Sequence, residues 1–232
     1  MANNENYPFV GYIADEGKVE YQPLLDYSSM PMYIKALEDI TVSFTTNTIQ
    51  YSLDNEAWVD LPVGESTPTI AAGDKVYFRA EGLSPSYGYG IGTFNISGRC
   101  HVEGNIMSLI HGDDFDNNIT IKNYAFFKLF QNQPIVDASR LILPATTMFE
   151  SCYQYMFSGC SSLVKAPELP ATNLASQCYY SMFLNCTSLV NAPALPATIL
   201  KTSCYSYMYK GCKNLAYIKM MALDGLSSGS YT

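Results

Sequence analysis

The second half of the chain repeats itself every 26 residues. Three consecutive segments begin with Leu-Pro-Ala-Thr and continue into a shared pattern of cysteine, tyrosine and methionine, over residues 143–168, 169–194 and 195–220. They align without insertion or deletion, and a degenerate copy lies at residues 123–146. A fixed period of about 20 to 50 residues is typical of chains that stack one small unit on the next. The period therefore predicts a short solenoid.

Each unit carries apolar residues at positions i, i+4 and i+8, as one face of a short helix would require. The first of these sets is Met148, Cys152 and Met156. Threonines stand where an N-cap belongs, and Gly159, Asn185 and Gly211 stand where a left-handed residue would end the helix. We expect about three helical turns in each unit, followed by a short extended piece that begins at Leu163, Leu189 or Leu215.

Two cysteines, eight residues apart, recur in every unit. Metal binding, disulfide formation, redox chemistry and packing are the four roles to consider. Eight helical residues separate two cysteines by ~12 Å, which is too far for a disulfide, and zinc sites favour closer spacing and a full set of four ligands. The histidines, His101 and His111, lie in other segments. Cysteine also packs well as a small buried hydrophobe. The predicted repeat core is therefore Cys152, Met156, Cys160, Leu163, Cys178, Met182, Cys186, Leu189, Cys204, Met208, Cys212 and Leu215, and Cys100 is assigned to the first half.

The first half has the pattern of a β-domain. Short runs of β-branched and aromatic residues alternate with turn clusters between residues 40 and 104. We expect an α+β protein with an N-terminal antiparallel β-sandwich over residues 33–106. A degenerate capping repeat would follow at 107–142, and the repeats with a C-terminal cap would occupy 143–232. Residues 1–32 form either an edge hairpin, pairing 8–13 with 18–22, or an arm that docks on a partner.

Charge and hydropathy exclude two classes of partner. The net charge of −8 disfavours nucleic acid, and the sequence has no apolar run long enough to span a bilayer. The N-terminus has neither the basic nor the apolar region of a secretory signal. We therefore expect a protein that is made in a bacterial cytoplasm and either stays there or leaves by lysis or within an assembled particle.

The repeat resembles BspA-type leucine-rich repeats. The segments Asn123–Pro144 and Cys178–Ala197 carry this resemblance, and the Leu-Pro-Ala-Thr form is similar to repeats encoded by tailed, crAss-like phages of gut Bacteroidales. The resemblance implies a leucine-rich-repeat (αβ) solenoid on a β-sandwich. It also implies a virion surface protein, such as a head fibre, tail fibre or capsid decoration, which contacts other virion proteins and is expected to form a homo-oligomer.

Two groups of side chains are candidates for function. Asp113, Asp114 and Asp116 could hold a calcium ion, but they lack a full ligand pattern, so an exposed acidic loop is the alternative. Tyrosines recur on the repeat at Tyr153, Tyr155, Tyr179, Tyr180, Tyr205 and Tyr207. They either pack partly in the core or form an exposed row for a protein or glycan partner.

The sequence thus predicts a non-enzymatic virion protein without a cofactor, which attaches to the particle and presents the repeats for binding. The alternative is a BspA-type adhesin on the bacterial cell surface. A glycan-acting enzyme that uses paired carboxylates is a minor alternative.

Overall fold

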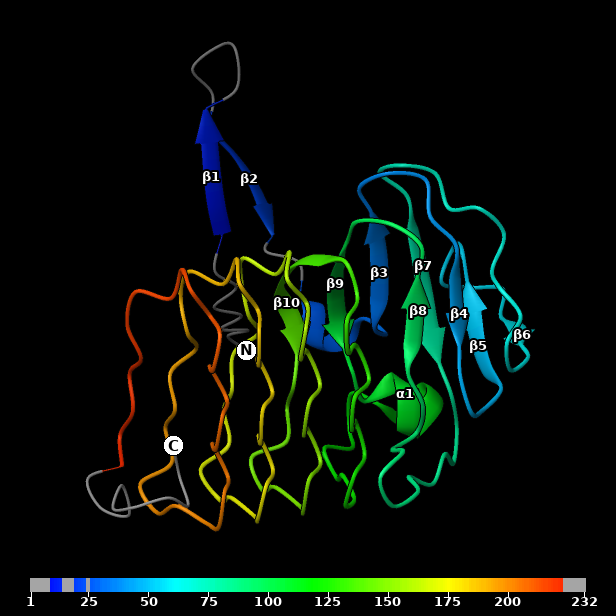
Figure 1. Ribbon diagram of the computed structural model, residues 1–232. Helices are drawn as coiled ribbons and strands as arrows, with labels where there is room; N and C mark the ends of the chain where they lie inside the picture. Colours follow the sequence, from blue (N-terminus) through cyan, green and yellow to red (C-terminus); the bar gives the residue numbers. More distant parts are fainter. Residues whose placement is uncertain (1–8, 14–18, 24–25, 223–232) are drawn as a thin grey trace, which may run out of the picture.

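A computed structural model describes residues 9–13, 19–23 and 26–222, with side chains from residue 26 onward. Six strands form one sheet in the order β10-β9-β3-β7-β5-β6, and two more pair as β4-β8 (Figure 1). The bounds in the large sheet are β3 (Tyr33–Ala36), β5 (Ile49–Ser52), β6 (Val59–Leu61), β7 (Lys75–Arg79), β9 (Cys100–Asn105) and β10 (Ile135–Ile142). The small pair is β4 (Val42–Phe44) and β8 (Phe94–Ile96), and the helical segments are η1 (Tyr27–Ser29), α1 (Ser108–His111) and η2 (Gly112–Asp114).

The N-terminal segment contains an antiparallel pair of its own, β1 (Phe9–Ile13) with β2 (Val19–Pro23), in which Phe9 lies opposite Pro23. Residues 1–8, 14–18, 24–25 and 223–232 lie outside the described residues. Parts of the expected arm and the end of the expected C-terminal cap fall in these ranges.

The expected antiparallel β-sandwich is wrong, because the main sheet is mixed. β10 pairs with β9 in parallel, whereas β3 pairs with both β9 and β7 in antiparallel fashion. β10 comes from the segment that was predicted to be a capping repeat. A whole loop of chain lies between β9 and β10, and a crossover of this length allows the second strand to enter in the same direction as the first.

The expected repeat helices are also wrong, and with them the α+β class and the leucine-rich-repeat (αβ) solenoid. In the described ranges the only α-helix is α1, which has four residues and precedes the repeats. Residues 149–160 instead form a run of tight turns, with left-handed backbone at Ser151, Tyr155 and Gly159 (φ 54°, 57° and 78°). An α-helix needs negative φ throughout. Turns that recur every four residues produce the same i, i+4, i+8 pattern that suggested a helix.

Hydrogen bonds between neighbouring repeats hold these turns. Every second amide donates to the next repeat, as Tyr153 N does to Cys178 O (2.9 Å) and Tyr179 N to Cys204 O (3.0 Å). The amides in between donate three residues back within their own turn, as Met156 N does to Tyr153 O (3.2 Å). Each repeat is therefore one coil of chain, and the coils lie side by side (Figure 1).

The coils continue the main sheet and its core. β10 belongs to the first coil, and the next coils extend its edge through Val164 N to Val136 O (2.8 Å) and Val190 N to Val164 O (3.4 Å). A row of stacked rings runs the same way, with centroids 5.4 to 5.8 Å apart, through Phe94, Phe130, Phe157, Phe183 and Tyr209. One hydrophobic core therefore runs from the β-region into the repeats.

An alternation of asparagine and glycine ends each run of turns. Asn132, Gly159, Asn185 and Gly211 occupy equivalent left-handed positions in successive coils. A Cβ added at Gly159 would overlap Oδ1 of Asn132, and one added at Gly211 would overlap Oδ1 of Asn185. Each asparagine side chain thus covers the glycine of the next coil.

We predict that Gly159→Ala lowers the free energy of unfolding by about 2 kcal/mol or more, because alanine resists a left-handed backbone and also meets Asn132. Gly64→Ala is the matched control, since Gly64 has φ 80° and nothing within 4 Å of the added Cβ. Urea unfolding should show the larger loss at Gly159.

Adding Asn132→Gly to Gly159→Ala should reduce the loss in free energy of unfolding to that of Gly64→Ala, because it removes the clash between the alanine Cβ and the asparagine side chain. Equal losses for the two single alanine variants would show that the asparagine does not cover the glycine.

Candidate binding surface

The repeat tyrosines divide into two groups. Tyr153, Tyr179 and Tyr205 are buried, with exposed fractions of 0%, 1% and 5%. Their rings stack nearly parallel at 5.7 and 5.8 Å, behind Phe126 in the first coil. Burial raises the pKa of all three hydroxyls. These three tyrosines belong to the core and are not available to a partner.

Tyr155, Tyr180 and Tyr207 reach the surface and contact one another edge to face. The Tyr155–Tyr180 and Tyr180–Tyr207 centroids lie 5.5 and 5.7 Å apart, at interplanar angles of 75° and 81°. Phe127 continues the row at 6.0 Å from Tyr155, and Tyr124 and Tyr87 extend it across the preceding loops. We call these six residues the aromatic strip: Tyr87, Tyr124, Phe127, Tyr155, Tyr180 and Tyr207.

A one-residue offset in the sequence explains the edge-to-face geometry. The first and third units read Gln154-Tyr155 and Ser206-Tyr207, whereas the middle unit reads Tyr180-Ser181. Ser181 holds the left-handed position that tyrosine holds in the neighbouring coils. The middle ring therefore approaches from the adjacent position, and it meets its neighbours edge-on instead of stacking on them.

The strip is partly exposed and is accompanied by cations. Tyr87 and Tyr207 are 83% and 46% exposed, and Tyr155 and Tyr180 are half-buried. Lys128 Nζ lies 5.0 Å from the Phe127 ring centre, and Lys210 Nζ lies 5.1 Å from that of Tyr207. Such a surface offers ring faces, phenol hydroxyls and ammonium donors to a partner. Phe127, Lys128 and Tyr124 were missed because they sit in the degenerate copy, where the tyrosine pattern is broken.

The predicted repeat core lies where packing requires it. Ten of its twelve residues are buried, and Cys212 and Leu215, in the last coil, are half-buried. The second cysteine of each unit donates its S–H to a carbonyl of the preceding coil: Cys160 to Phe130 (3.0 Å), Cys186 to Phe157 (3.1 Å) and Cys212 to Phe183 (3.0 Å). All seven cysteines are free thiols.

Cys100 does not stand apart from the repeat cysteines. Burial raises its pKa to about 12, and the neighbouring Cys160 adds to the effect. Cys100 begins β9, and β9 lies beside the first coil. The thiol therefore lies at the start of the row formed by Cys160, Cys186 and Cys212.

The aspartate cluster does not form a metal site. Asp113, Asp114 and Asp116 are exposed, and Asp113 pairs with Arg79. Across the described part of the chain, no three potential ligands gather closely enough to hold a metal ion.

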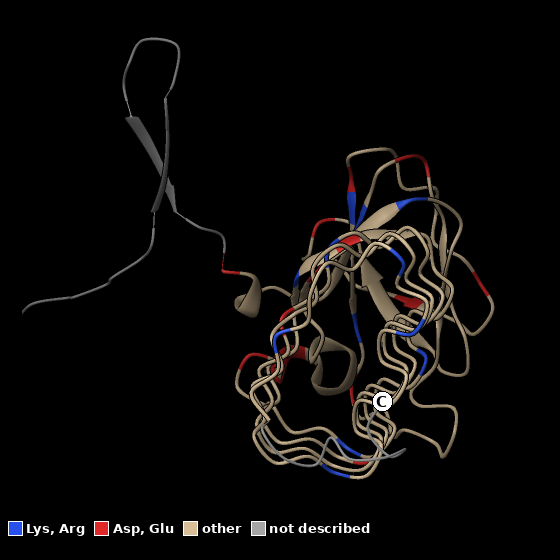
Figure 2. Cartoon of the chain, turned by 60° about the vertical axis from the view of Figure 1, so that its left-hand side comes forward, with Lys and Arg blue, Asp and Glu red and all other residues tan. Residues whose placement is uncertain are grey.

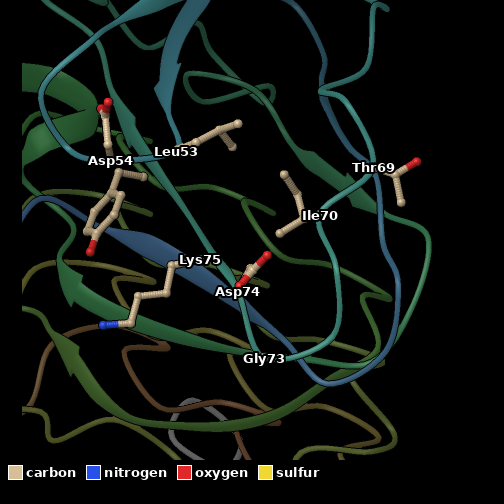
Figure 3. A pocket seen from close by; sticks show the side chains of 8 residues that line it. Leu53, Asp54, Thr69, Ile70, Gly73, Asp74 and Lys75 are labelled. Carbon is tan, nitrogen blue, oxygen red and sulfur yellow. The ribbon is translucent and has the colours of Figure 1, made fainter.

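A depression of about 540 Å³ opens beside β5 and β7 and is lined by Leu53, Asp54, Ile70, Asp74, Lys75 and other residues (Figure 3). The carboxylate of Asp54 is engaged within its own turn, where it accepts hydrogen bonds from the amides of Ala57 and Glu56 (both 2.9 Å). These hydrogen bonds lower the pKa of Asp54. The lining offers no histidine or thiol. We see no catalytic arrangement in it.

One buried carboxylate was not anticipated. Glu103, on β9, is only 4% exposed. It accepts a hydrogen bond from the Tyr33 hydroxyl, and its Oε1 lies 3.7 Å from His101 Nδ1 and 3.8 Å from Arg140 Nη1. The group ties β3, β9 and β10 together, which gives it a structural role.

Comparison of the chain with protein-family models, curated proteins and solved structures finds no match. Among the described residues, no helix has the length and apolar character needed to cross a bilayer.

We predict that stability falls as pH rises from about 9 to about 12. Burial raises the pKa of Cys152 and Cys160 from 9.0 to about 12 and that of Cys212 to about 11. In this window the unfolded chain loses thiol protons that the folded chain keeps, so unfolding becomes more favourable. Below about pH 9 the contribution of these thiols to the free energy of unfolding is constant.

Urea unfolding at about pH 7 and about pH 10.5 measures the effect. Cys152→Ala should reduce the difference between the two midpoints, because one titrating thiol is removed. Identical midpoints for the unaltered protein would show that the thiols are not buried.

Proposed function

We propose that this protein is a non-enzymatic virion protein of a tailed phage that binds a host-surface protein or glycan through the aromatic strip. The N-terminal half would attach it to the particle as a fibre or decoration. The phage setting rests on the sequence resemblance. The binding role rests on one observation, the continuous row of six aromatic residues, five of which are at least partly exposed while Phe127 is buried.

The physical properties of the strip suit recognition. Tyrosine brings a large amphipathic contact area and loses little entropy when it is ordered, since it has only two side-chain torsions. Backbone hydrogen bonds hold the positions of Tyr155 and Tyr180 directly, because Tyr155 N donates to Tyr180 O (3.0 Å). The rings are therefore arranged before a partner arrives, which lowers the entropic cost of binding.

We predict that Tyr155→Ala, Tyr180→Ala and Tyr207→Ala each weaken binding to host-cell envelopes by about 1–2 kcal/mol, roughly 5- to 30-fold. Titration of labelled protein onto purified envelopes gives the affinity. Tyr217→Ala is the control, because Tyr217 is 62% exposed and lies outside the strip. Equal affinity for all four variants would show that the aromatic strip is not the binding site.

Mass spectrometry of purified phage particles tests the setting. The peptide spanning residues 166–186 should appear in stoichiometric amounts relative to capsid or tail proteins. Its presence only on bacterial envelopes would replace the virion assignment by the cell-surface adhesin.

A further inference from the structure

The last coil has an edge of backbone donors that find no acceptor among the described residues. The amides of residues 177, 179, 181, 183 and 185 donate to carbonyls of the last coil. The equivalent amides of that coil belong to residues 203, 205, 207, 209 and 211, and none of the described residues accepts from them, although residues 219–221 begin a further coil beside Leu195. Since every inter-coil peptide has the same orientation, this edge is the positive end of aligned peptide dipoles.

The same coil carries concentrated positive charge. Residues 195–222 contain four exposed lysines and no acidic residue, in a chain of net charge −8: Lys201, Lys210, Lys213 and Lys219. All 21 acidic residues and only nine of the 13 basic ones lie elsewhere, so the rest of the chain carries −12. Figure 2 turns this end toward the viewer, with Lys and Arg in blue and Asp and Glu in red.

The opposite end of the molecule has complementary properties. β6 is the last strand of the main sheet, and it lies far from the last coil (Figure 1). Residues 54–65 around it carry four exposed acidic side chains and no basic one: Asp54, Glu56, Asp60 and Glu65. Leu53, Val59 and Val63 are 52–54% exposed beside them. An edge strand with exposed apolar residues is a natural template for pairing with another chain.

Apolar side chains are also exposed on the last coil. Ile199, Tyr217 and Met221 are 70%, 62% and 50% exposed. Both ends therefore combine backbone groups without a partner among the described residues, exposed apolar side chains and charge, and the charges are opposite in sign.

We propose that copies of this chain associate head to tail, with the last coil of one copy docking on β6 and the acidic segment 53–65 of the next. A symmetric contact between two last coils would bring lysines against lysines and N–H groups against N–H groups. A head-to-tail contact instead joins donors to the carbonyls of an edge strand, and lysines to carboxylates. Such a contact generates a ring if it closes and a fibre if it does not. The last coil also carries Tyr207 of the aromatic strip, whereas Lys201 and Lys213 lie outside the strip.

Sedimentation velocity on charge-reversed variants tests the proposal. Lys201→Glu/Lys213→Glu reverses two of the four charges on the last coil and leaves that end with no net charge, and Glu56→Lys/Asp60→Lys does the same to the acidic segment. Each double variant alone should lose self-association by at least about tenfold in affinity, and an equimolar mixture of the two should recover it. Glu150→Lys/Glu168→Lys is the matched control: it makes the same charge change as the second variant away from both ends, and it should associate like the unaltered protein.

A closed ring of fixed size and a fibre that grows with protein concentration would both support the head-to-tail contact. Variants that still associate alone, or a mixture that stays monomeric, would overturn it. An unaltered protein that associates only after removal of residues 223–232 would assign the edge of backbone donors to the chain's own terminus, and would also overturn it. Circular dichroism confirms that each variant is folded, and the envelope-binding assay reports separately on the proposed receptor function.

Discussion

The hydrogen bonds between coils are the interaction on which the rest of the structure depends. Each inter-coil peptide accepts from the coil before it and donates to the coil after it, so the peptides form continuous columns along the stack. This geometry requires a left-handed residue at every fourth position of the turn run, as at Ser151, Tyr155 and Gly159. It also brings identical positions of successive units to ring-stacking distance, and the strict period of 26 residues follows from that requirement.

The columns place chemically different rows on different sides of one coil. Positions that face inward stack as the Tyr153 and Phe157 rows and as the buried cysteines, which seal the core. The position at Tyr155 faces outward, and a single-residue offset at Tyr180 turns that row into an exposed edge-to-face strip. Because β10 is both part of the first coil and a strand of the main sheet, the strip stands on the same rigid core as the β-region.

The repeat period and the residues of its core could be read from the sequence, because both depend only on which positions recur. The left-handed backbone at Gly159, Asn185 and Gly211 could also be anticipated, since glycine and asparagine favour it. The secondary structure could not, because turns of four residues and a helix give the same apolar spacing. The mixed sheet could not be predicted, because β10 lies in the first coil and its pairing with β9 depends on where the fold places that coil. For the tyrosines, the exposed and buried sets could not be separated without the true turn geometry.

The most direct test of this account is the detection of scalar couplings across hydrogen bonds by NMR. In the deuterated, isotope-labelled protein, the amide nitrogen of Tyr153 should couple to the carbonyl carbon of Cys178, and that of Tyr179 to the carbonyl carbon of Cys204. These two couplings would identify donor and acceptor in successive coils. A coupling from Tyr153 to the carbonyl carbon of Phe149 instead, four residues earlier, would show a helix in each repeat and would contradict the stack of coils.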